Sequence, residues 1–400
     1  MIQRESDAIE SRVRLFINGL AASAGGGATY LRNVIPHLSR RIDVETTVLL
    51  NPAIRREFGD LPNIAFVEIG DTGGTLRRFI WEQTGLPKLL RHNRAHVLLS
   101  PGNFALWNSP VPQILLSRNS LYTSDEFLRD LRARGDYGML ADTLVKGWFA
   151  KQSLRRAEIS VAPSAGFAHE LSQWSGAEVR ALHHGFDADA FTSDRTPLPP
   201  EVLREFDHTK DALRLLFVSH YNYYRNFETL FRALPILSEK IPGKKVKLFL
   251  TCKLSSAANP GAYRTDRASS LASTLCSYQS VVELGTIPYR SLHHLYRQCH
   301  IYVTPAYAES FAHPLVEAMS NGLPVAASDL AVHREICGDA AVYFPYNSPE
   351  ALAEQVLEIY RSPNLAQKLA SNGLRRALDF SWSQHVESLI TMVKKVTRKK

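Results

Sequence analysis

The sequence predicts an α/β protein with two parallel sheets, each covered by crossover helices. Short apolar runs typical of buried strands alternate with stretches of helical spacing along the chain. The alternation breaks once, at residues 192–211, and then starts again. The length of 400 residues also favours two or three domains, since a domain has roughly 150 residues. We therefore expect two Rossmann-like halves, with a ligand in the cleft at the carboxyl ends of their strands.

The first half is expected to begin with a strand, a glycine-rich loop and a helix. The strand covers residues 14–18, and helical spacing follows over residues 29–40. Further short apolar runs predict buried strands at residues 44–50, 96–100, 113–117 and 159–162.

The break in the pattern indicates a linker. Residues 196–200 read TPLPP and are flanked by charges, which is typical of a segment between domains. We place the first domain at residues 1–196 and the second at 197–380, with a hinge near residue 200. In the second half, strands are predicted at 214–219, 247–251, 281–284, 301–304, 325–328 and 341–344, and a helix at 226–237.

Composition excludes several classes of protein. An apolar fraction of 45% with 22% charged residues is ordinary for a globular chain, and no apolar run is long enough for a membrane-spanning helix. The polar N-terminus and four scattered cysteines favour a cytoplasmic location with reduced thiols. The net charge of +8 favours an anionic partner, and the absence of a nucleic-acid-binding signature argues against nucleic acid.

Two basic segments leave a membrane contact open. The tail at residues 394–400 is either solvated or attracted to an anionic leaflet. Residues 127–151 mix arginines with Phe127, Tyr137 and Trp148, which suits either a peripheral membrane surface or a pair of core helices.

Several common ligand motifs are absent. Tyr30 replaces the third glycine of G-x-G-x-x-G, and no Walker A or H-E-x-x-H sequence occurs. We therefore expect no metal and no bound cofactor. The triplet Gly25, Gly26 and Gly27 still lies between a strand and a helix, where its backbone either approaches a phosphate or forms a plain turn.

The segment from residue 301 to 329 is the most informative. A strand ends near Pro305, and a helix with Pro314 in its first turn follows. We expect Glu309 in the loop and Glu317 in the first helical turn. From geometry alone, these are either ligand-binding carboxylates or a loop acid and a surface acid that complements the helix dipole.

With Glu309 and Glu317 eight residues apart, and with Phe311, Pro314, Gly322 and Pro324 around them, this segment resembles the E-x7-E signature of retaining GT-B glycosyltransferases of family 4. Residues 184–187, residues 285–296 and the F-S-W sequence at 380–382 are also similar to that family. The resemblance implies two Rossmann-like domains facing across a cleft. It also implies that residues 381–400 form a helix returning to the N-terminal domain, followed by the basic tail.

The resemblance further implies a retaining transferase that uses a UDP- or GDP-linked sugar, of the kind found in polysaccharide biosynthesis. The acceptor would be a glycan, a glycolipid or a small-molecule hydroxyl. Glu317 would bind the ribose and Glu309 the donor sugar. The backbone at Phe311 and Ala312 would hold the diphosphate, Ile287 would lie beside the base, and Gly25, Gly26 and Gly27 would face the donor phosphate.

The sequence departs from the family pattern at three places, and at one of them residues 251–253 read TCK where the family has Gly-x-Gly. His220 and Arg225 stand where the family usually has G-R-x4-K, so Arg225 keeps a permanent charge. His220 is either a donor to phosphate, which would raise donor affinity at lower pH, or a packed aromatic residue. Arg118 and Asn119 replace the usual His-Asp pair on the acceptor side; Arg118 is no general base, and is either an anion or hydroxyl ligand or a surface residue.

For the chemistry we expect same-face attack, with Arg225, His220 and backbone N–H groups stabilising the leaving diphosphate without a metal. The alternatives are a glycan phosphorylase on the same fold and a non-catalytic protein that binds anions or nucleic acid. The donor sugar, its base and the acceptor stay open.

Overall fold

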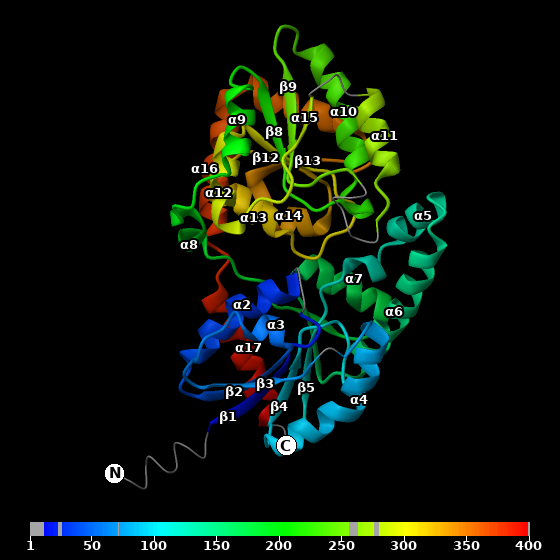
Figure 1. Cartoon of the computed structure of the whole chain (residues 1–400), viewed down its shortest axis with the longest axis vertical. Coiled ribbons are helices and arrows are strands. Elements are labelled where there is room, and N and C mark those ends of the chain that lie inside the picture. Colours follow the sequence, from blue (N-terminus) through cyan, green and yellow to red (C-terminus); the bar gives the residue numbers. More distant parts are fainter. Residues whose placement is uncertain (1–11, 23–25, 71, 256–262, 276–279, 399–400) are drawn as a thin grey trace. The chain divides into compact units, whose positions relative to one another are not determined.

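The computed structural model describes residues 12–22, 26–70, 72–255, 263–275 and 280–398, which form two compact units (Figure 1). The N-terminal unit comprises residues 1–123, 136–185 and 381–400. The C-terminal unit comprises residues 124–135 and 186–380. Each unit is built on its own parallel sheet.

The sheet of the N-terminal unit has the order β3-β2-β1-β4-β5-β6-β7 within the described residues, and every pairing is parallel. Its order reverses between β1 and β4, which makes that place the topological switch point where ligands of such sheets bind. The strands are β1 Val13–Asn18, β2 Val44–Leu50, β3 Ile64–Glu68, β4 Val97–Ser100, β5 Gln113–Leu116, β6 Ile159–Ala162 and β7 Val179–Ala181.

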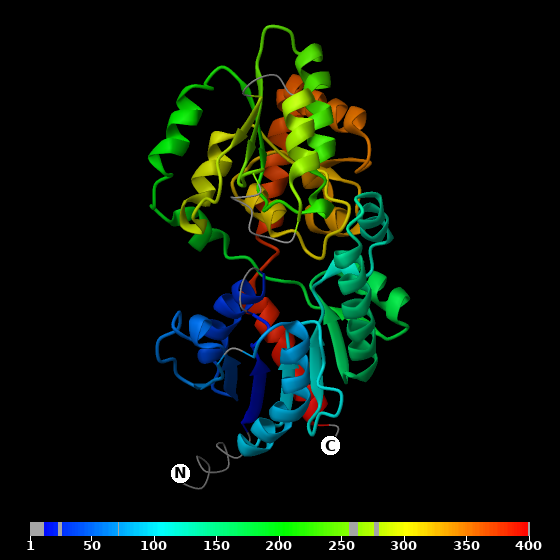
Figure 2. The same cartoon turned by 45° about the vertical axis from the view of Figure 1, so that its right-hand side comes forward.

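Helices cover both faces of this sheet, as Figure 2 shows from a second side. They are α2 Gly26–Ser39, α3 Pro52–Arg55, α4 Thr75–His92, α6 Tyr137–Arg156, α7 Ala165–Ser175 and α17 Trp382–Thr397, with a 3-10 turn η1 Ser120–Tyr122. None of the helices in the described part of the chain is both long enough and apolar enough to cross a membrane.

The C-terminal helix α17 lies in the core of the N-terminal unit. Its apolar face, including Trp382, Val386 and Leu389, packs with Leu15 and Val34. A Cβ at Gly185 would lie only 2.1 Å from the backbone N of Trp382, so a glycine is needed where these segments meet. The predicted return of the last helix to the N-terminal domain is therefore confirmed.

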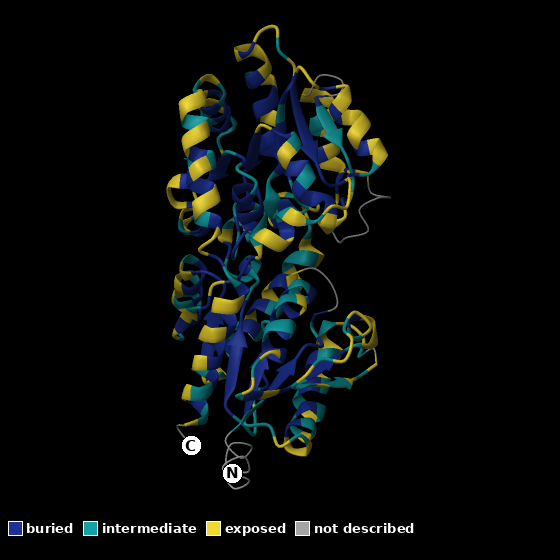
Figure 3. Ribbon diagram, turned by 90° about the vertical axis from the view of Figure 1, so that its left-hand side faces the viewer, coloured by how far each residue is buried: buried dark blue, intermediate teal, exposed yellow. Residues whose placement is uncertain are grey.

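The sheet of the C-terminal unit has the order β10-β9-β8-β11-β12-β13, again parallel throughout. The switch point lies between β8 and β11. Figure 3 shows that both sheets are largely buried. The strands are β8 Leu213–Phe217, β9 Val246–Leu250, β10 Val281–Glu283, β11 Ile301–Thr304, β12 Val325–Ser328 and β13 Ala341–Phe344.

The C-terminal unit includes one helix, α5, from the first third of the chain. Its helices are α5 Asp125–Ala133, α8 Ala188–Ser193, α9 Pro200–Asp207, α10 Phe227–Lys240, α11 Asp266–Leu275, α12 Leu292–Gln298, α13 His313–Ser320, α14 Ala331–Cys337, α15 Pro349–Arg361 and α16 Pro363–Ala377. The 3-10 turns are η2 Tyr223–Arg225, η3 Tyr289–Ser291 and η4 Gly338–Ala340.

The division between the units differs from the predicted boundary at residue 196. It falls after Gly185, and the expected linker contains helices α8 and α9. These helices are anchored by aromatic contacts within the C-terminal unit: Phe191 lies 5.1 Å from Tyr289 between ring centroids, and Phe206 stacks on Phe249 at 4.5 Å. Prolines and charges thus marked helix ends here rather than an unfolded connection.

Candidate functional site

The predicted carboxylate Glu309 and cation Arg225 meet at the switch point of the C-terminal unit. Arg225 ends η2 after β8, and Glu309 lies in the loop after β11. The Arg225 Nη1 donates to Glu309 Oε2, and the Ser310 N–H donates to Glu309 Oε1 at 3.0 Å. The loops are also tied directly, because the Tyr307 N–H donates to the Tyr224 carbonyl at 3.0 Å. Two positions 84 residues apart thus form one charged pair.

This pair is buried but keeps both charges. Burial alone would raise the pKa of Glu309, but the Arg225 guanidinium outweighs it and holds that pKa below its ordinary value. Burial would lower the pKa of Arg225, and Glu309 raises it instead. The Arg225 Nε has no hydrogen-bond partner among the described residues, so the guanidinium keeps a donor for a ligand.

The sequence did not single out His333, which lies beside this pair. It is fully buried in α14, and its ring Nδ1 lies 2.9 Å from the Ser328 carbonyl oxygen. Burial lowers the pKa of His333, although the charge of Glu309 opposes that shift. Its Nε2 has no partner within the described part of the chain. Only the tertiary fold places this imidazole near Glu309, so no local spacing could have indicated it.

Glu317 is buried in α13 rather than exposed at its start. Glu317 was predicted in the first turn of this helix. The helix begins at His313, so Glu317 instead lies after the first turn. The Tyr296 hydroxyl donates to Glu317 Oε2 at 2.7 Å. Burial raises the pKa of Glu317 to about 7, although the bond from Tyr296 opposes the shift. This environment rules out the alternative of a surface acid that only complements the helix dipole.

The loop before α13 has a constrained backbone. Ala312 precedes the helix in the left-handed region, with φ of 65°, which is rare for residues with a side chain. Phe311 packs edge-on against Phe380, with ring centroids 5.5 Å apart. Ile287, expected beside the base, is largely buried in the same unit. A strained turn at a helix start is typical of ligand-binding loops.

His220 is exposed at the loop after β8, which excludes the alternative of a packed aromatic residue. Its neighbours Tyr221 and Tyr223 are the buried members of that segment. The His220 carbonyl accepts a hydrogen bond from Asn222 Nδ2 at 3.2 Å. The two expected cations therefore lie in different environments, since Arg225 is mostly buried.

The predicted residues of the N-terminal unit also converge on its switch point. Arg118, after β5, donates through Nη1 to the Gly26 carbonyl at 2.6 Å and through Nη2 to the Pro101 carbonyl at 2.7 Å. Gly26 and Gly27 are the first residues of α2, so they form a helix start rather than a loop. Gly25 lies outside the described residues. Asn119 caps η1 by accepting from the Leu121 N–H.

Helix α5 supports the loops that carry Arg225 and Glu309. Arg134, which directly follows α5, donates to Asp130 Oδ1 at 2.8 Å and to Glu228 Oε1 at 2.7 Å, and its guanidinium lies 4.2 Å from the centroid of the Tyr223 ring. The Tyr307 hydroxyl donates to Asp130 Oδ2 at 2.9 Å. Phe127 itself is fully buried. The part of the 127–151 segment around Phe127 therefore belongs to the core and does not form a membrane surface.

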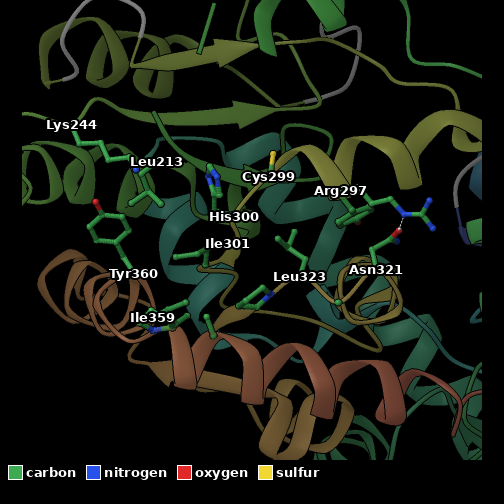
Figure 4. Close-up of a pocket in the computed structure, with 15 residues that line it drawn as sticks. Leu213, Lys244, Arg297, Cys299, His300, Ile301, Asn321, Leu323, Ile359 and Tyr360 are labelled. Atoms are coloured by element: carbon green, nitrogen blue, oxygen red, sulfur yellow. Dashed lines mark hydrogen bonds between the residues drawn. The ribbon is translucent and has the colours of Figure 1, made fainter. Parts of the chain in front are cut away.

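A pocket of about 450 Å³ in the C-terminal unit lies at the other edge of the sheet (Figure 4). It is lined by Leu213 and Ile301, which begin β8 and β11, and by Pro324, which precedes β12. Because the switch-point residues follow the carboxyl ends of the strands, this pocket is separate from them. The described residues contain no group of three or more His, Cys, Asp or Glu side chains that could hold a metal ion.

Comparison with known proteins finds a family match within the C-terminal unit. Residues 200–376 match the model of the glycosyl transferases group 1. The O-antigen chain mannosyltransferase B of Escherichia coli is 31% identical over 111 residues, which cover 28% of this chain and 29% of that protein. The D-inositol 3-phosphate glycosyltransferase of Actinosynnema mirum is 28% identical over 220 residues, or 54% of this chain and 51% of that protein. The chain thus spans about half or less of these relatives.

Solved structures match almost the whole chain. The sucrose-phosphate synthase of Thermosynechococcus elongatus superposes with a TM-score of 0.77 at 17% identity, over 97% of this chain and all of that one. The Anabaena protein HepE in complex with UDP-glucose gives a TM-score of 0.70 at 16% identity, over 96% of this chain and all of that one. The predicted α/β fold of two Rossmann-like domains, of the GT-B class, is confirmed.

Proposed function

We propose that this protein is a retaining glycosyltransferase that moves a sugar from a UDP- or GDP-linked donor to a hydroxyl acceptor. The observation that carries the proposal is the buried Arg225–Glu309 pair at the switch point of the unit that matches the glycosyl transferases group 1, together with the buried Glu317 of the same unit. The same domain holds the E-x7-E pattern that suggested this chemistry from the sequence. HepE, a structural neighbour, was solved with UDP-glucose.

In the proposed reaction, Glu317 accepts hydrogen bonds from the ribose hydroxyls and Ile287 lies beside the base. The backbone at Phe311 and Ala312 holds the diphosphate. Arg225 neutralises the charge that grows on the diphosphate, and Glu309 orients Arg225 and contacts the donor sugar. A preorganised cation of this kind lowers the barrier because negative charge develops only as the leaving group departs.

Retention follows from attack on the same face as the leaving group. The bond between the anomeric carbon and the phosphate oxygen breaks, and the acceptor oxygen bonds to that carbon from the same side. The acceptor proton passes to the departing phosphate oxygen, so the reaction needs orientation more than a side-chain base. We propose that His220 supplies a further donor to the diphosphate, that Arg118 and the start of α2 contribute from the N-terminal unit, and that no cofactor or metal takes part.

A panel of UDP- and GDP-linked sugars with glycan and glycolipid acceptors tests this function. We expect release of the nucleoside diphosphate, and NMR of the product should show the anomeric configuration of the donor retained. An inverted product would reject the retaining mechanism. Release of a sugar phosphate from a glycan and inorganic phosphate, without any reaction of nucleotide sugars, would instead identify a phosphorylase.

A further inference from the structure

Large apolar side chains are exposed together on two helices of the N-terminal unit. They are Leu76 and Ile80 on α4 and Tyr137, Leu144, Val145 and Trp148 on α6. Each is between 49% and 66% exposed. Single exposed apolar residues are ordinary, whereas a group of them marks an interaction surface.

The two helices lie side by side, and an apolar pocket opens between them. The rings of Phe79 on α4 and Phe149 on α6 are 4.9 Å apart between centroids. A pocket of about 460 Å³ is lined by these two rings, by Phe104 and by the exposed Leu76 and Val145. It is large enough for part of a hydrocarbon chain rather than for isolated waters.

Cationic side chains outnumber acidic ones on both helices. Helix α4 carries Arg77, Arg78, Lys88 and Arg91 against the single acid Glu82, which is buried. Helix α6 carries Lys146, Lys151, Arg155 and Arg156 against the single acid Asp142, which is paired with Lys146. Arg77, Lys146 and Asp142 all line the pocket. Because cations outnumber acids along both helices, a ligand that is apolar and anionic at once suits this face.

We propose that this α4–α6 face docks on an anionic lipid bilayer and that the pocket between the helices receives an acyl or prenyl chain. Apolar side chains with Trp and Tyr among them enter the boundary of the bilayer, while Arg and Lys bind the negative headgroups. A chain bound in this pocket would make a lipid-linked molecule the acceptor class. This assignment of the acceptor rests on the proposed function, whereas the docking on a bilayer does not. The α4–α6 face keeps the part of the sequence-based candidate that lies on α6, with Tyr137 and Trp148, and leaves out Phe127, which is buried.

Sedimentation with vesicles tests the docking. The full chain should bind vesicles of phosphatidylglycerol and phosphatidylcholine at low salt, should bind pure phosphatidylcholine weakly, and should release at high salt. The double substitution Ile80→Glu and Val145→Glu should lower the bound fraction at least about tenfold, because two carboxylates would face the headgroups. Ile42→Glu changes an even more exposed residue of the same unit outside α4 and α6, and it should bind like the wild type.

Equal binding of the double variant and the wild type would overturn the proposal, as would failure of the wild type to bind anionic vesicles. A concentration-dependent dimer that the double substitution abolishes, without vesicle binding, would assign the face to a second copy instead. Titration with UDP and GDP separates the two proposals. Vesicle binding without nucleotide binding would contradict the transferase function and support the docking face. Nucleotide binding without vesicle binding would contradict only the docking face.

Discussion

Both units place an arginine at the switch point of their sheets, but the two arginines are compensated differently. Arg225 of the C-terminal unit is paired with the carboxylate of Glu309. Arg118 of the N-terminal unit donates to the carbonyls of Gly26 and Pro101, and no ion pair of it occurs among the described residues. Burial lowers the pKa of Arg118 to about 10, which still leaves it charged near neutrality. One unit thus holds a closed ion pair, and the other holds a cation stabilised by carbonyl dipoles and by the ring of Tyr30.

This difference assigns the two units different tasks under the proposed function. An anionic ligand at Arg225 must compete with Glu309 for the guanidinium. This competition favours binding of the negative charge that develops in the transition state over binding of the ground state. Arg118 instead fixes the start of α2 to the loop after β4. Because no carboxylate among the described residues neutralises it, its positive charge can attract an anion. The following predictions test that division, from the largest expected effect to the smallest.

The largest effect is expected from Arg134→Met, which removes the cation between Asp130 and Glu228. Breaking a buried ion pair leaves an unpaired charge and costs about 3–5 kcal/mol of folding free energy. Both Arg134 and Glu228 have less than a tenth of their side chains exposed. Arg32→Met in the N-terminal unit is the matched control, because the pair of Arg32 with Glu57 is exposed and should contribute about 0–1 kcal/mol. Equal denaturant midpoints for the two variants would contradict the assignment of α5 to the C-terminal unit.

Arg225→Ala should lower turnover about a hundredfold or more, since loss of one preorganised donor costs about 2.7–4 kcal/mol of transition-state stabilisation. Arg225→Lys should recover part of the rate, because the charge stays while the planar geometry is lost. Arg334→Ala removes a guanidinium from an exposed pair with Asp329 and is the control. Near-normal turnover of Arg225→Ala would transfer the leaving-group role to another cation.

Nucleotide affinity should increase as the pH rises through about 7, the pKa of the buried Glu317. The carboxylate accepts the ribose hydroxyls only when ionised, so affinity at pH 6 should be about tenfold weaker than at pH 8. Glu317→Gln should remove this dependence. A rise in affinity toward lower pH would contradict this role of Glu317. Because the native pKa lies above the ordinary 4.5, the unliganded protein should also lose stability as the pH rises from about 4.5 to about 7.

The smallest effect concerns two adjacent glycines at the start of α2. A Cβ at Gly27 would lie 3.0 Å from the Ala22 Cα and 3.3 Å from Arg118 Nη2, whereas a Cβ at Gly26 meets nothing closer than 3.8 Å. Gly27→Ala should therefore displace Arg118 and lower turnover up to about tenfold, since small misplacements of reacting groups are costly. Gly26→Ala should stay near wild type. Gly27→Ala should change UDP or GDP affinity less than turnover, because we assign most of the nucleotide contacts to the C-terminal unit; a loss of affinity as large as the loss of turnover would contradict that assignment.

The same contrast explains what the sequence could predict. Most buried strands were found because short apolar runs bounded by turns indicate them, and five of them, β2, β6, β11, β12 and β13, were placed to the residue. Helix α4 was missed because Gly85 and Pro87 interrupt it, and β3 because it is an edge strand that is only partly buried. Edge strands and interrupted helices lack the strong periodicity on which such predictions depend.

At the site, the sequence identified the residues with charged side chains but not their supports. Glu309 and Glu317 carry a recognisable spacing, whereas the partners of Arg118 are backbone carbonyls, which leave no trace in a sequence. His333 and α5 reach the site only through the tertiary fold, and Arg134 and Glu228 are 94 residues apart. Contacts of this kind depend on topology, and no local pattern encodes them.

The most direct test of the account is a calorimetric titration of UDP, GDP and inorganic phosphate into the wild type, Glu317→Ala and the exposed control Glu354→Gln. We predict that UDP or GDP binds much more tightly than phosphate to the wild type and the control. Glu317→Ala should lose most of that affinity while keeping its unfolding temperature, because hydrogen bonds to a charged group contribute about 1.5–3 kcal/mol each. Equal affinity of the wild type for phosphate and nucleotides, or unchanged nucleotide affinity in Glu317→Ala, would contradict a nucleotide-sugar site in the C-terminal unit.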